Sequence, residues 1–358
     1  MVNTERKPHS WEEILKKIRN KKVVIFGADI VGKLTHMLLK EAGIEIQNYI
    51  DNNKNKVRKK IASKQVIDAK IWLKENNQDT IIIIASTYIE DIIYQLEEMG
   101  YLNWVPIFQL LIDQKQKKFL DYFDESLKYN HTGGKFTDDF ILFAVDNMIN
   151  SQMKYFKEDY VFMRSVDFVI TEKCSLKCKD CCNLMQFYEK PENIDKIQLF
   201  EELDMLLTVV DELNELRVIG GDPLMNKHCY ETVQKASSYS KINKVDVYTN
   251  GVICPKENDL LKLKNPKSFV FITTYGDLSK NASKLANMYE KYGINYNIQP
   301  AYGWTDCGEV KDYQRNENEL KDLFRFCCAK NFITMTDGKI YRCPFAANAD
   351  RLKATPND

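Results

Sequence analysis

Four cysteines lie within nine positions of one short stretch, TEKCSLKCKDCCNLMQF at residues 171–187. Three of them, Cys174, Cys178 and Cys181, have the spacing C-x3-C-x2-C. Three thiolates on an irregular loop can hold three irons of a cubane cluster, whereas a closed structural metal site needs four ligands. The fourth iron is then open to a small molecule. The alternative is a structural zinc site that Cys182 or a distant cysteine completes.

The composition indicates the compartment in which these cysteines act. The chain has 358 residues, of which 44% are hydrophobic and 28% charged, enough for two or three domains with real cores. Its 51 basic residues balance its 51 acidic ones, so the charge indicates no nucleic-acid or membrane partner. The sequence shows neither a signal peptide nor an apolar run of membrane-spanning length. We therefore expect a cytoplasmic protein whose ten cysteines are metal or redox ligands rather than disulfides.

The first 112 residues alternate between buried strands and amphipathic helices. Short apolar runs predict strands at 22–28, 44–53 and 80–86. Helical periodicity predicts the helices, which are 11–20, 29–43, 66–77 and 88–100. Because strand and helix take turns, we expect a small doubly wound, Rossmann-like domain over residues 1–112. The more polar stretch 113–160 is interpreted as a helical linker.

The alternation resumes at Ser165. The predicted strands are SVDFVIT, LRVIGG, KVDVYTNG, SFVFITTYG and INYNIQP, between 165 and 300. Helices connect them, so we expect five parallel strands in a partial barrel or an open sheet. In either architecture the chemistry lies in the loops after the carboxyl ends of the strands. The cysteine loop and the turns GGDP, TNG and TYG each follow a strand, so we expect them to meet.

The cysteine loop after a first strand resembles the signature of the radical S-adenosylmethionine (SAM) superfamily. The resemblance covers residues 165–300 and implies a partial (β/α)6 barrel. It implies that Cys174, Cys178 and Cys181 bind a 4Fe-4S cluster, with the amino nitrogen and carboxylate of SAM on the open iron. One electron then cleaves SAM into methionine and a 5′-deoxyadenosyl radical, which abstracts a hydrogen atom from a substrate.

Further residues match the SAM-binding elements of that superfamily. Gly220, Gly221, Asp222 and Pro223 stand where the superfamily has Gly-Gly-Glu-Pro, which implies backbone carbonyls and an acid beside the methionine ammonium. Asp222 reaches one methylene less than Glu does. The resemblance implies contacts to the ribose, carboxylate or adenine of SAM from Thr249, Asn250, Thr273, Thr274 and Gln299. Taken singly, these turns have an equally simple structural explanation.

The loop also departs from the pattern of the superfamily. Asp180 stands where an aromatic residue usually precedes the last cysteine, which puts the local packing in doubt rather than the ligation. Cys182 follows the third ligand directly and is interpreted as a small packed thiol. Cys229 and Cys254 are interpreted as buried hydrophobic residues.

A second group of cysteines follows the predicted barrel, at Cys307, Cys327, Cys328 and Cys343. The sequence predicts a β-hairpin turned at residues 337–338 between them. The spacing Gly-x4-Cys after an upstream cysteine resembles the SPASM or Twitch extension, which implies an auxiliary iron–sulfur cluster. The alternative is a zinc hairpin or spare thiols. Either Cys307 completes the ligand set, or the chain is part of a longer protein; we expect no helix after the hairpin. Cys307 is also a candidate hydrogen-atom donor to a substrate radical.

The N-terminal stretch VVIFGADIVGK contains part of a dinucleotide fingerprint. Gly27 and Gly32 occupy its first and third glycine positions, but Asp29 occupies the second and would face a pyrophosphate. Asp51 stands where a ribose-binding acid belongs. We interpret the domain as a structural Rossmann-like module rather than a nucleotide site. Its DNN after the second strand resembles small domains of capsule and surface-polysaccharide biosynthesis proteins.

Together these patterns predict an α/β protein in four parts. These are a Rossmann-like domain (1–112), a helical linker (113–160), a partial radical SAM barrel (161–300) and a hairpin extension (301–358). The expected function is hydrogen abstraction from a sugar or nucleotide-sugar, leading to epimerisation, dehydration or oxidation, with a flavodoxin or ferredoxin as electron donor. The alternatives are a peptide-modifying maturase, which usually has an N-terminal winged helix that is not predicted here, and a non-catalytic zinc scaffold.

Overall fold

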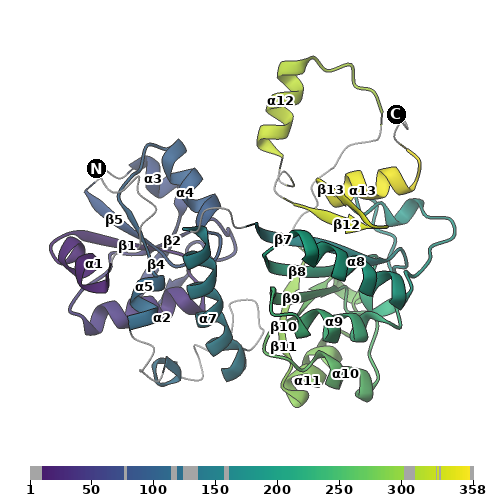
Figure 1. The fold of residues 1–358 in the computed structure, drawn as a ribbon, viewed down its shortest axis with the longest axis horizontal. Coiled ribbons are helices and arrows are strands. Elements are labelled where there is room, and N and C mark those ends of the chain that lie inside the picture. Colours follow the sequence, from purple (N-terminus) through teal and green to yellow (C-terminus); the bar gives the residue numbers. More distant parts are fainter. Residues whose placement is uncertain are drawn as a thin grey trace. The chain divides into compact units, whose positions relative to one another are not determined.

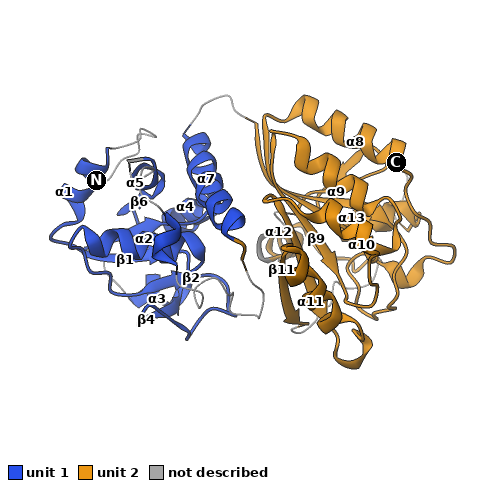
Figure 2. Ribbon diagram, turned by 90° about the horizontal axis from the view of Figure 1, so that it is seen from below, with its two compact units in different colours: residues 1–131, 138–160 blue, residues 132–137, 161–358 orange. Residues whose placement is uncertain are grey.

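The computed structural model describes residues 10–75, 79–113, 119–123, 136–156, 161–301, 311–327, 329 and 332–354. The chain forms two compact units, coloured separately in Figure 2. Unit 1 comprises residues 1–131 and 138–160, and unit 2 comprises 132–137 and 161–358. The α/β class predicted from the sequence is confirmed, because helices and mixed sheets make up both units.

A six-stranded sheet forms the centre of unit 1 (Figure 1), in the order β3-β4-β2-β1-β5-β6. The strands are β1 (Lys22–Phe26), β2 (Tyr49–Asp51), β3 (Lys60–Ile61), β4 (Lys64–Asp68), β5 (Thr80–Ile84) and β6 (Trp104–Pro106). All neighbours pair in parallel except β3 with β4, which form a hairpin. The chain therefore adds strands first on one side of β1 and then on the other, which is a doubly wound order.

Helices surround this sheet. They are α1 (Trp11–Ile18), α2 (Ile30–Glu41), α3 (Ala69–Glu75), α4 (Ile89–Glu98), α5 (Phe108–Asp113) and α7 (Asp138–Tyr155), with a 3-10 turn at Phe119–Tyr122. Sequence analysis places α7 in a linker, but it packs with α2, α4 and α5 in unit 1. Helix α7 packs there because it has an apolar face, which includes the buried residues Phe140, Ile141 and Ile149.

A seven-stranded sheet forms the centre of unit 2, in the order β11-β10-β9-β8-β7-β12-β13. The strands are β7 (Phe162–Thr171), β8 (Glu212–Gly220), β9 (Ile242–Thr249), β10 (Ser268–Thr274), β11 (Asn295–Pro300), β12 (Thr334–Thr336) and β13 (Lys339–Tyr341). From β7 to β11 the strands are parallel and adjacent in chain order. Their carboxyl ends therefore lie along one edge of the sheet, where the predicted site residues are found.

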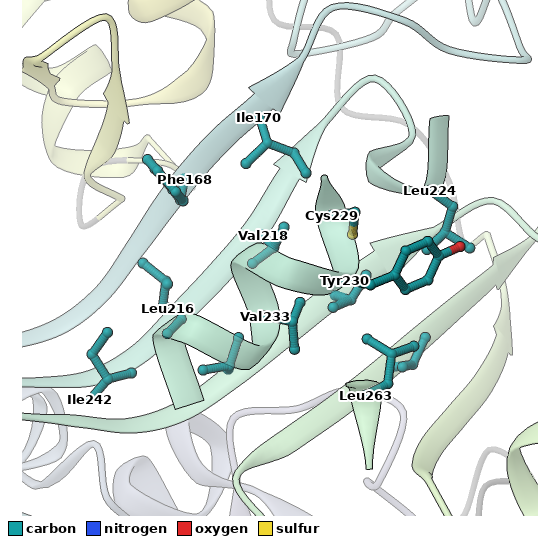
Figure 3. Close-up of a cluster of buried hydrophobic side chains, with 14 of the residues drawn as sticks. Phe168, Ile170, Leu216, Val218, Leu224, Cys229, Tyr230, Val233, Ile242 and Leu263 are labelled. Atoms are coloured by element: carbon teal, nitrogen blue, oxygen red, sulfur yellow. The ribbon is translucent and has the colours of Figure 1, made fainter. Parts of the chain in front are cut away.

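One face of this sheet packs against helices (Figure 1). The helices are α8 (Lys196–Val209), α9 (Cys229–Ser238), α10 (Glu257–Leu263) and α11 (Ala282–Tyr292). Alternate strand residues such as Phe168, Val218 and Val270 enter the same core as Leu203 of α8. Figure 3 shows a part of this core, in which Cys229 is fully buried, as predicted for that cysteine.

The chain after β11 forms a hairpin that lies beyond β7, on the side of the sheet away from β11. Helix α12 (Glu317–Phe326) precedes it, and α13 (Pro344–Arg351) follows it. β12 pairs in parallel with β7 and antiparallel with β13, and Asp337 and Gly338 form the turn with φ of 52° and 68°. The expectation that no helix follows the hairpin is wrong. Pro344 at the first helical position and a buried Ala347 favour the start of α13.

Several short elements differ from the sequence-based expectation. The predicted strand 44–53 is a strand only at β2, and the predicted helix 66–77 begins with three residues of β4. The strands β3 and β6 and the helix α10 were not predicted. Strands of two or three residues carry too little periodicity to be recognised, and pairing with longer neighbours stabilises them.

Candidate functional site

The cysteine loop begins directly after β7, which lies between β8 and β12 in the unit 2 sheet. Cys174, Cys178, Cys181 and Cys182 are all half-buried and none forms a disulfide. The start of the loop is bonded to the end of the neighbouring strand β8. There the backbone N–H of Gly221 donates to the carbonyl of Thr171 at 3.0 Å, and that of Asp222 to Lys173 at 2.8 Å. The strand order therefore fixes where the loop leaves the sheet.

The glycine pair at the end of β8 is required by this close contact. Gly220 has a φ of +145°, and a Cβ atom there would lie 2.1 Å from the carbonyl oxygen of Thr171. A Cβ atom on Gly221 would lie 2.1 Å from the carbonyl oxygen of Lys173 and 2.9 Å from Cβ of Cys174. Side chains at either position would displace the cysteine loop. The structure thus gives the two glycines a packing role that the sequence did not reveal.

Asp222 has its carboxylate inside the protein, with no solvent exposure. It accepts hydrogen bonds from the backbone N–H groups of Leu224 (3.0 Å) and Asn250 (3.1 Å), and from the hydroxyl of Thr249 (2.9 Å). Burial raises the pKa of Asp222, and these three hydrogen bonds oppose the rise. The carboxylate therefore ties the end of β8 to the end of β9, and a direct role beside SAM stays a prediction.

Asn250 connects the end of β9 to the cysteine loop. Its amide nitrogen lies 3.0 Å from the hydroxyl of Ser175 and 3.6 Å from the sulfur of Cys174, so it can donate to both. Its backbone is held by Asp222, and its amide oxygen accepts from Val252 at 3.1 Å. Thr249, which precedes it, is buried and donates to Asp222. Of these two candidates, Asn250 contacts the cysteine loop directly, whereas Thr249 bonds to Asp222, which holds the backbone of Asn250.

The remaining SAM-binding candidates lie at the ends of the next two strands. Thr273 and Thr274 end β10 and are half-buried, as is Gln299 on β11. Thr274 donates its hydroxyl to the carbonyl of Gln299 at 3.4 Å. Pro223 is buried and begins a 3-10 turn, so it shapes the backbone after the glycine pair. The structure thus places these residues along one edge of the sheet.

Tyr275 is a site residue that the sequence analysis did not single out. It follows β10, and burial together with the charges of Cys178, Cys181, Cys174 and Cys182 raises its pKa to about 12. Tyr275 is therefore on the same side of unit 2 as the cysteine loop. The only signal in the sequence was an aromatic residue in the turn TYG after the fourth strand.

The cysteine loop fits an iron–sulfur cluster in the chemistry of its donors. Among the described residues, no group of three or more His, Cys, Asp or Glu side chains is already arranged as a metal site. However, the charges of Cys174, Cys178 and Cys181 act on one another, and an amide donor lies beside Cys174. Burial raises the pKa of Cys174 to about 11 and also raises that of Cys178. A metal that binds there must displace the thiol protons.

The hairpin extension is bonded to the base of the cysteine loop through Arg351 of α13. Its guanidinium contacts Glu172 at 2.7 Å, the hydroxyl of Thr336 at 2.9 Å and Asp337 at 3.1 Å. Glu172 lies two residues before Cys174 and also accepts from the backbone of Glu192 at 2.8 Å. The side chains of Arg351 and Glu172 are only 13% and 11% exposed. The extension is therefore part of the support of the loop.

Comparison with known proteins identifies relatives of part of this chain. GTP 3',8-cyclase from Alkaliphilus metalliredigens is 29% identical over 136 residues, 33% of this chain and 42% of that protein. GTP 3',8-cyclase from Alkaliphilus oremlandii is 28% identical over 172 residues, 43% of this chain and 53% of that protein. The chain thus spans about half the length of the curated relatives it matches. The GTP 3',8-cyclases are radical SAM enzymes.

The chain is similar in sequence to radical SAM enzymes over the 172 residues that match the Alkaliphilus oremlandii protein. In addition, residues 19–104 match a family described as C2185-like, N-terminal. Among solved structures, BtrN in complex with AdoMet and 2-DOIA has a TM-score of 0.35 at 15% identity, covering 52% of this chain and 75% of that one. Streptococcus suis SuiB bound to S-adenosylmethionine has a TM-score of 0.35 at 17% identity, covering 69% and 56%. Scores this low do not bear on the arrangement of the present chain.

The second group of cysteines is described only in part. Cys307 and Cys328 lie outside the described residues. Cys327 follows α12 and is half-buried, while Cys343 precedes α13 and accepts a hydrogen bond from the backbone of Ala346 at 3.4 Å. An auxiliary cluster at these four cysteines stays a prediction, as does the hydrogen-donor role of Cys307.

Two acidic residues of the N-terminal unit, Asp29 and Asp51, have partners within that unit. Asp51 accepts from the backbone N–H groups of Ala28 (2.9 Å) and Asn53 (2.8 Å), and its carboxylate pairs with Lys56 at 3.2 Å. Lys56 also pairs with Asp29. Burial lowers the pKa of Lys56, but the two carboxylates outweigh that effect and raise it. Both acids therefore serve an internal ion-pair network.

The side chain of Gln152 in α7 forms hydrogen bonds with the backbone at the carboxyl ends of β5 and β6. Doubly wound sheets bind ligands near such strand ends. The amide nitrogen of Gln152 donates to the carbonyls of Ile84 (2.8 Å) and Ser86 (3.0 Å). Its oxygen accepts from the backbone N–H groups of Ile107 (2.9 Å) and Phe108 (3.0 Å). These contacts support the structural interpretation of unit 1.

Among the residues that the structure describes, no helix has the length and apolar character needed to cross a membrane.

Proposed function

We propose that this chain is a radical SAM enzyme in which Cys174, Cys178 and Cys181 hold a 4Fe-4S cluster. When bound, the cluster and SAM supply one-electron chemistry that removes a hydrogen atom from a substrate. A flavodoxin or ferredoxin is the proposed electron donor. The sequence similarity to the GTP 3',8-cyclases supports this proposal.

The convergence of strand ends on the cysteine loop is the observation that carries the proposal. The end of β8 is bonded to Thr171 and Lys173, and Asn250 at the end of β9 contacts Cys174. The charges of all four cysteines raise the pKa of Tyr275, which follows β10. A structural metal hairpin needs no such surroundings, whereas a cofactor of the size of SAM needs polar groups from several strands.

The residues of the site have distinct proposed roles. The glycine pair lets the loop pack against β8, and Asp222 fixes the backbone of Asn250. Asn250 donates to the sulfur of Cys174, which favours the thiolate form. Hydroxyl and amide groups that remain half-buried at the strand ends would bind SAM; these are Thr273, Thr274 and Gln299.

The substrate is proposed to be a sugar or nucleotide-sugar in polysaccharide biosynthesis. Epimerisation, dehydration and oxidation are all compatible with hydrogen abstraction from a carbon bearing a hydroxyl group. The support is the likeness of the N-terminal unit to domains of surface-polysaccharide proteins, as its sequence indicates. The alternative substrate is a peptide, because the hairpin extension resembles the SPASM or Twitch extension and is compatible with a peptide-modifying maturase.

Formation of 5′-deoxyadenosine tests the proposal. The protein is purified without oxygen, reconstituted with iron and sulfide, and mixed with SAM and dithionite. We expect 5′-deoxyadenosine from the wild type and none from Cys178→Ala, because two thiolates do not hold the cluster with one open iron. Cys254→Ala is the matched control and should retain formation, since Cys254 packs against the core. Colourless protein with stoichiometric zinc would instead support the non-catalytic zinc scaffold.

A further inference from the structure

Unit 1 contains a pocket that takes no part in the proposed radical SAM function. It lies between the connection from β2 to β3, the strand β4 and the first turn of α3. Its volume of about 440 Å³ lies within the range of small-molecule sites, about 300–1,000 Å³. We call it the basic pocket, and the lining residues that determine its chemistry are Lys54, Val57, Arg58, Ile67, Asp68 and Ile71.

The connection beside the basic pocket carries many positive charges. Residues 54–64, KNKVRKKIASK, include six basic residues and no acidic one, although the whole chain has 51 of each kind. Lys56 and Lys64 have carboxylate partners in unit 1. Lys54 and Arg58 are exposed on the wall of the pocket, and neither side chain forms an ion pair or a hydrogen bond with another described residue. Their charges are therefore available to a ligand.

The basic pocket keeps a positive charge although one carboxylate lines it. The charged lining residues are Lys54, Arg58 and Asp68, so two positive charges and one negative charge leave a net charge of +1. Oδ1 of Asp68 accepts a hydrogen bond from the backbone N–H of Ile71 at 3.1 Å, so this oxygen is already used at the start of α3. The pocket therefore attracts an anion.

The backbone holds Arg58 at the pocket in an unusual conformation. The N–H of Arg58 donates to the carbonyl of Val66 at 2.8 Å, and the N–H of Val66 donates to the carbonyl of Lys59 at 2.8 Å. Arg58 has a φ of 70°, in the left-handed region that glycine and asparagine adopt more easily. No hydrogen bond or ion pair of its side chain within the described residues offsets this cost. Residues held in such conformations are concentrated at functional sites.

Lys56 fixes the connection from the inside of unit 1. Its ammonium contacts the carboxylates of Asp29 at 2.5 Å and Asp51 at 3.2 Å, and the residue is only 8% exposed. The backbone N–H of Lys59 donates to the carbonyl of Lys56 at 3.1 Å. These contacts order the wall of the pocket before a ligand arrives, which lowers the entropic cost of binding.

The basic and apolar parts of the wall together select a class of ligand. A guanidinium binds phosphate through two parallel hydrogen bonds, and an ammonium binds it as a point charge. A phosphate ester has three acceptor oxygens and a charge of about −1.5 to −2, enough for Lys54 and Arg58 together, whereas one arginine already satisfies a carboxylate. Val57, Ile67 and the 53% exposed Ile71 offer an apolar surface to the carbon skeleton of such an ester.

We propose that the basic pocket binds a small phosphate ester, with the phosphate at Lys54 and Arg58 and the carbon skeleton against the apolar wall. All lining residues belong to unit 1, so this proposal goes beyond the radical SAM function and does not rest on it. The pocket is also separate from the dinucleotide fingerprint, since Asp29 and Asp51 pair with Lys56 and do not line it.

Isothermal titration calorimetry on the full chain tests this proposal. The probes are inorganic phosphate and glucose 6-phosphate, with glucose as the uncharged analogue and glucuronate as the carboxylate analogue. We expect both phosphate probes to bind, glucose 6-phosphate to bind more tightly than glucuronate, and glucose not to bind.

The variants of the two cations locate the binding site. Arg58→Gln removes the charge without relieving the backbone, and should weaken the binding of glucose 6-phosphate about tenfold. Lys54→Gln should weaken it about fivefold, because a single exposed charge contributes less. Arg19→Gln, at an exposed arginine outside the pocket, is the matched control and should bind glucose 6-phosphate as the wild type does.

Three results would overturn the proposal. These are no binding of either phosphate probe in the millimolar range, binding of glucuronate as tight as that of glucose 6-phosphate, or wild-type affinity in both cation variants when circular dichroism shows them folded. Formation of 5′-deoxyadenosine concerns the cysteine loop in unit 2 and is measured separately. The failure of one proposal therefore leaves the other standing.

Discussion

At the scale of single residues, Asp222 links the strand ends that lie beside the cysteine loop. Its carboxylate is fully buried and accepts from Leu224, Thr249 and Asn250, so it holds the two strand ends that flank the loop. The superfamily resemblance implied a direct role beside SAM for this acid. In the structure it holds the backbone of Asn250, whose amide reaches the sulfur of Cys174, while the role beside SAM stays a prediction.

Two substitutions of Asp222 test this role. Asp222→Asn places a donor opposite the backbone N–H of Asn250 and should cost about 1–3 kcal/mol in the free energy of unfolding. Asp222→Glu restores the residue of the superfamily but adds a methylene to a fully packed site, and should also cost about 1–3 kcal/mol. Urea unfolding measures both. Asp277→Asn, at an exposed position, is the control and should change little. A Glu variant as stable as the wild type would contradict the positioning role.

At the scale of elements, the hairpin extension stabilises the cysteine loop from the side opposite to β8. β12 joins the sheet beside β7, and α13 returns Arg351 to Glu172 at the base of the loop. Tyr188, at the far end of the loop region, donates to Asn348 of α13 at 2.8 Å, and Asn348 is itself fully buried. The loop is thus attached to the extension at both of its ends.

Removal of Arg351 should loosen this attachment. Arg351→Met leaves the mostly buried carboxylate of Glu172 without its cation, which should cost about 3 kcal/mol. Hydrogen–deuterium exchange should then become faster in residues 334–341 and in the cysteine loop. Lys339→Met is the matched control, because its ion pair with Asp350 is exposed and contributes less than about 1 kcal/mol. Unchanged exchange in Arg351→Met would show that the extension does not support the loop.

At the scale of the whole molecule, local sequence patterns predicted most of the fold but only part of the site. The alternation of apolar runs and amphipathic helices predicted the parallel strands of both units, because each long strand carries its own periodicity. The short strands β3 and β6 and the helix α13 depend on contacts with distant segments. The same limit applies to the site. The spacing of the cysteines is local, whereas the contacts of Asp222 and Arg351, and the place of Tyr275, join residues far apart in the chain.

The ion pairs of Lys56 with Asp29 and Asp51 in unit 1 are also contacts that local sequence patterns do not predict. The sequence placed Asp29 and Asp51 at fingerprint positions, but it did not indicate that Lys56 pairs with both. Nor did it indicate that Gln152 comes back from α7 to bond the strand ends of β5 and β6. Such contacts decide whether a fingerprint binds a ligand, and they appear only when the chain is folded.

The central claim is that three thiolates hold a cubane cluster whose fourth iron binds SAM. Mössbauer spectroscopy of protein reconstituted with 57Fe, with and without SAM, measures this directly. We predict that addition of SAM shifts the signal of one iron site in four and leaves the other three unchanged. A spectrum of four equivalent sites that SAM does not alter, or a protein that retains zinc and no cluster, would contradict the account.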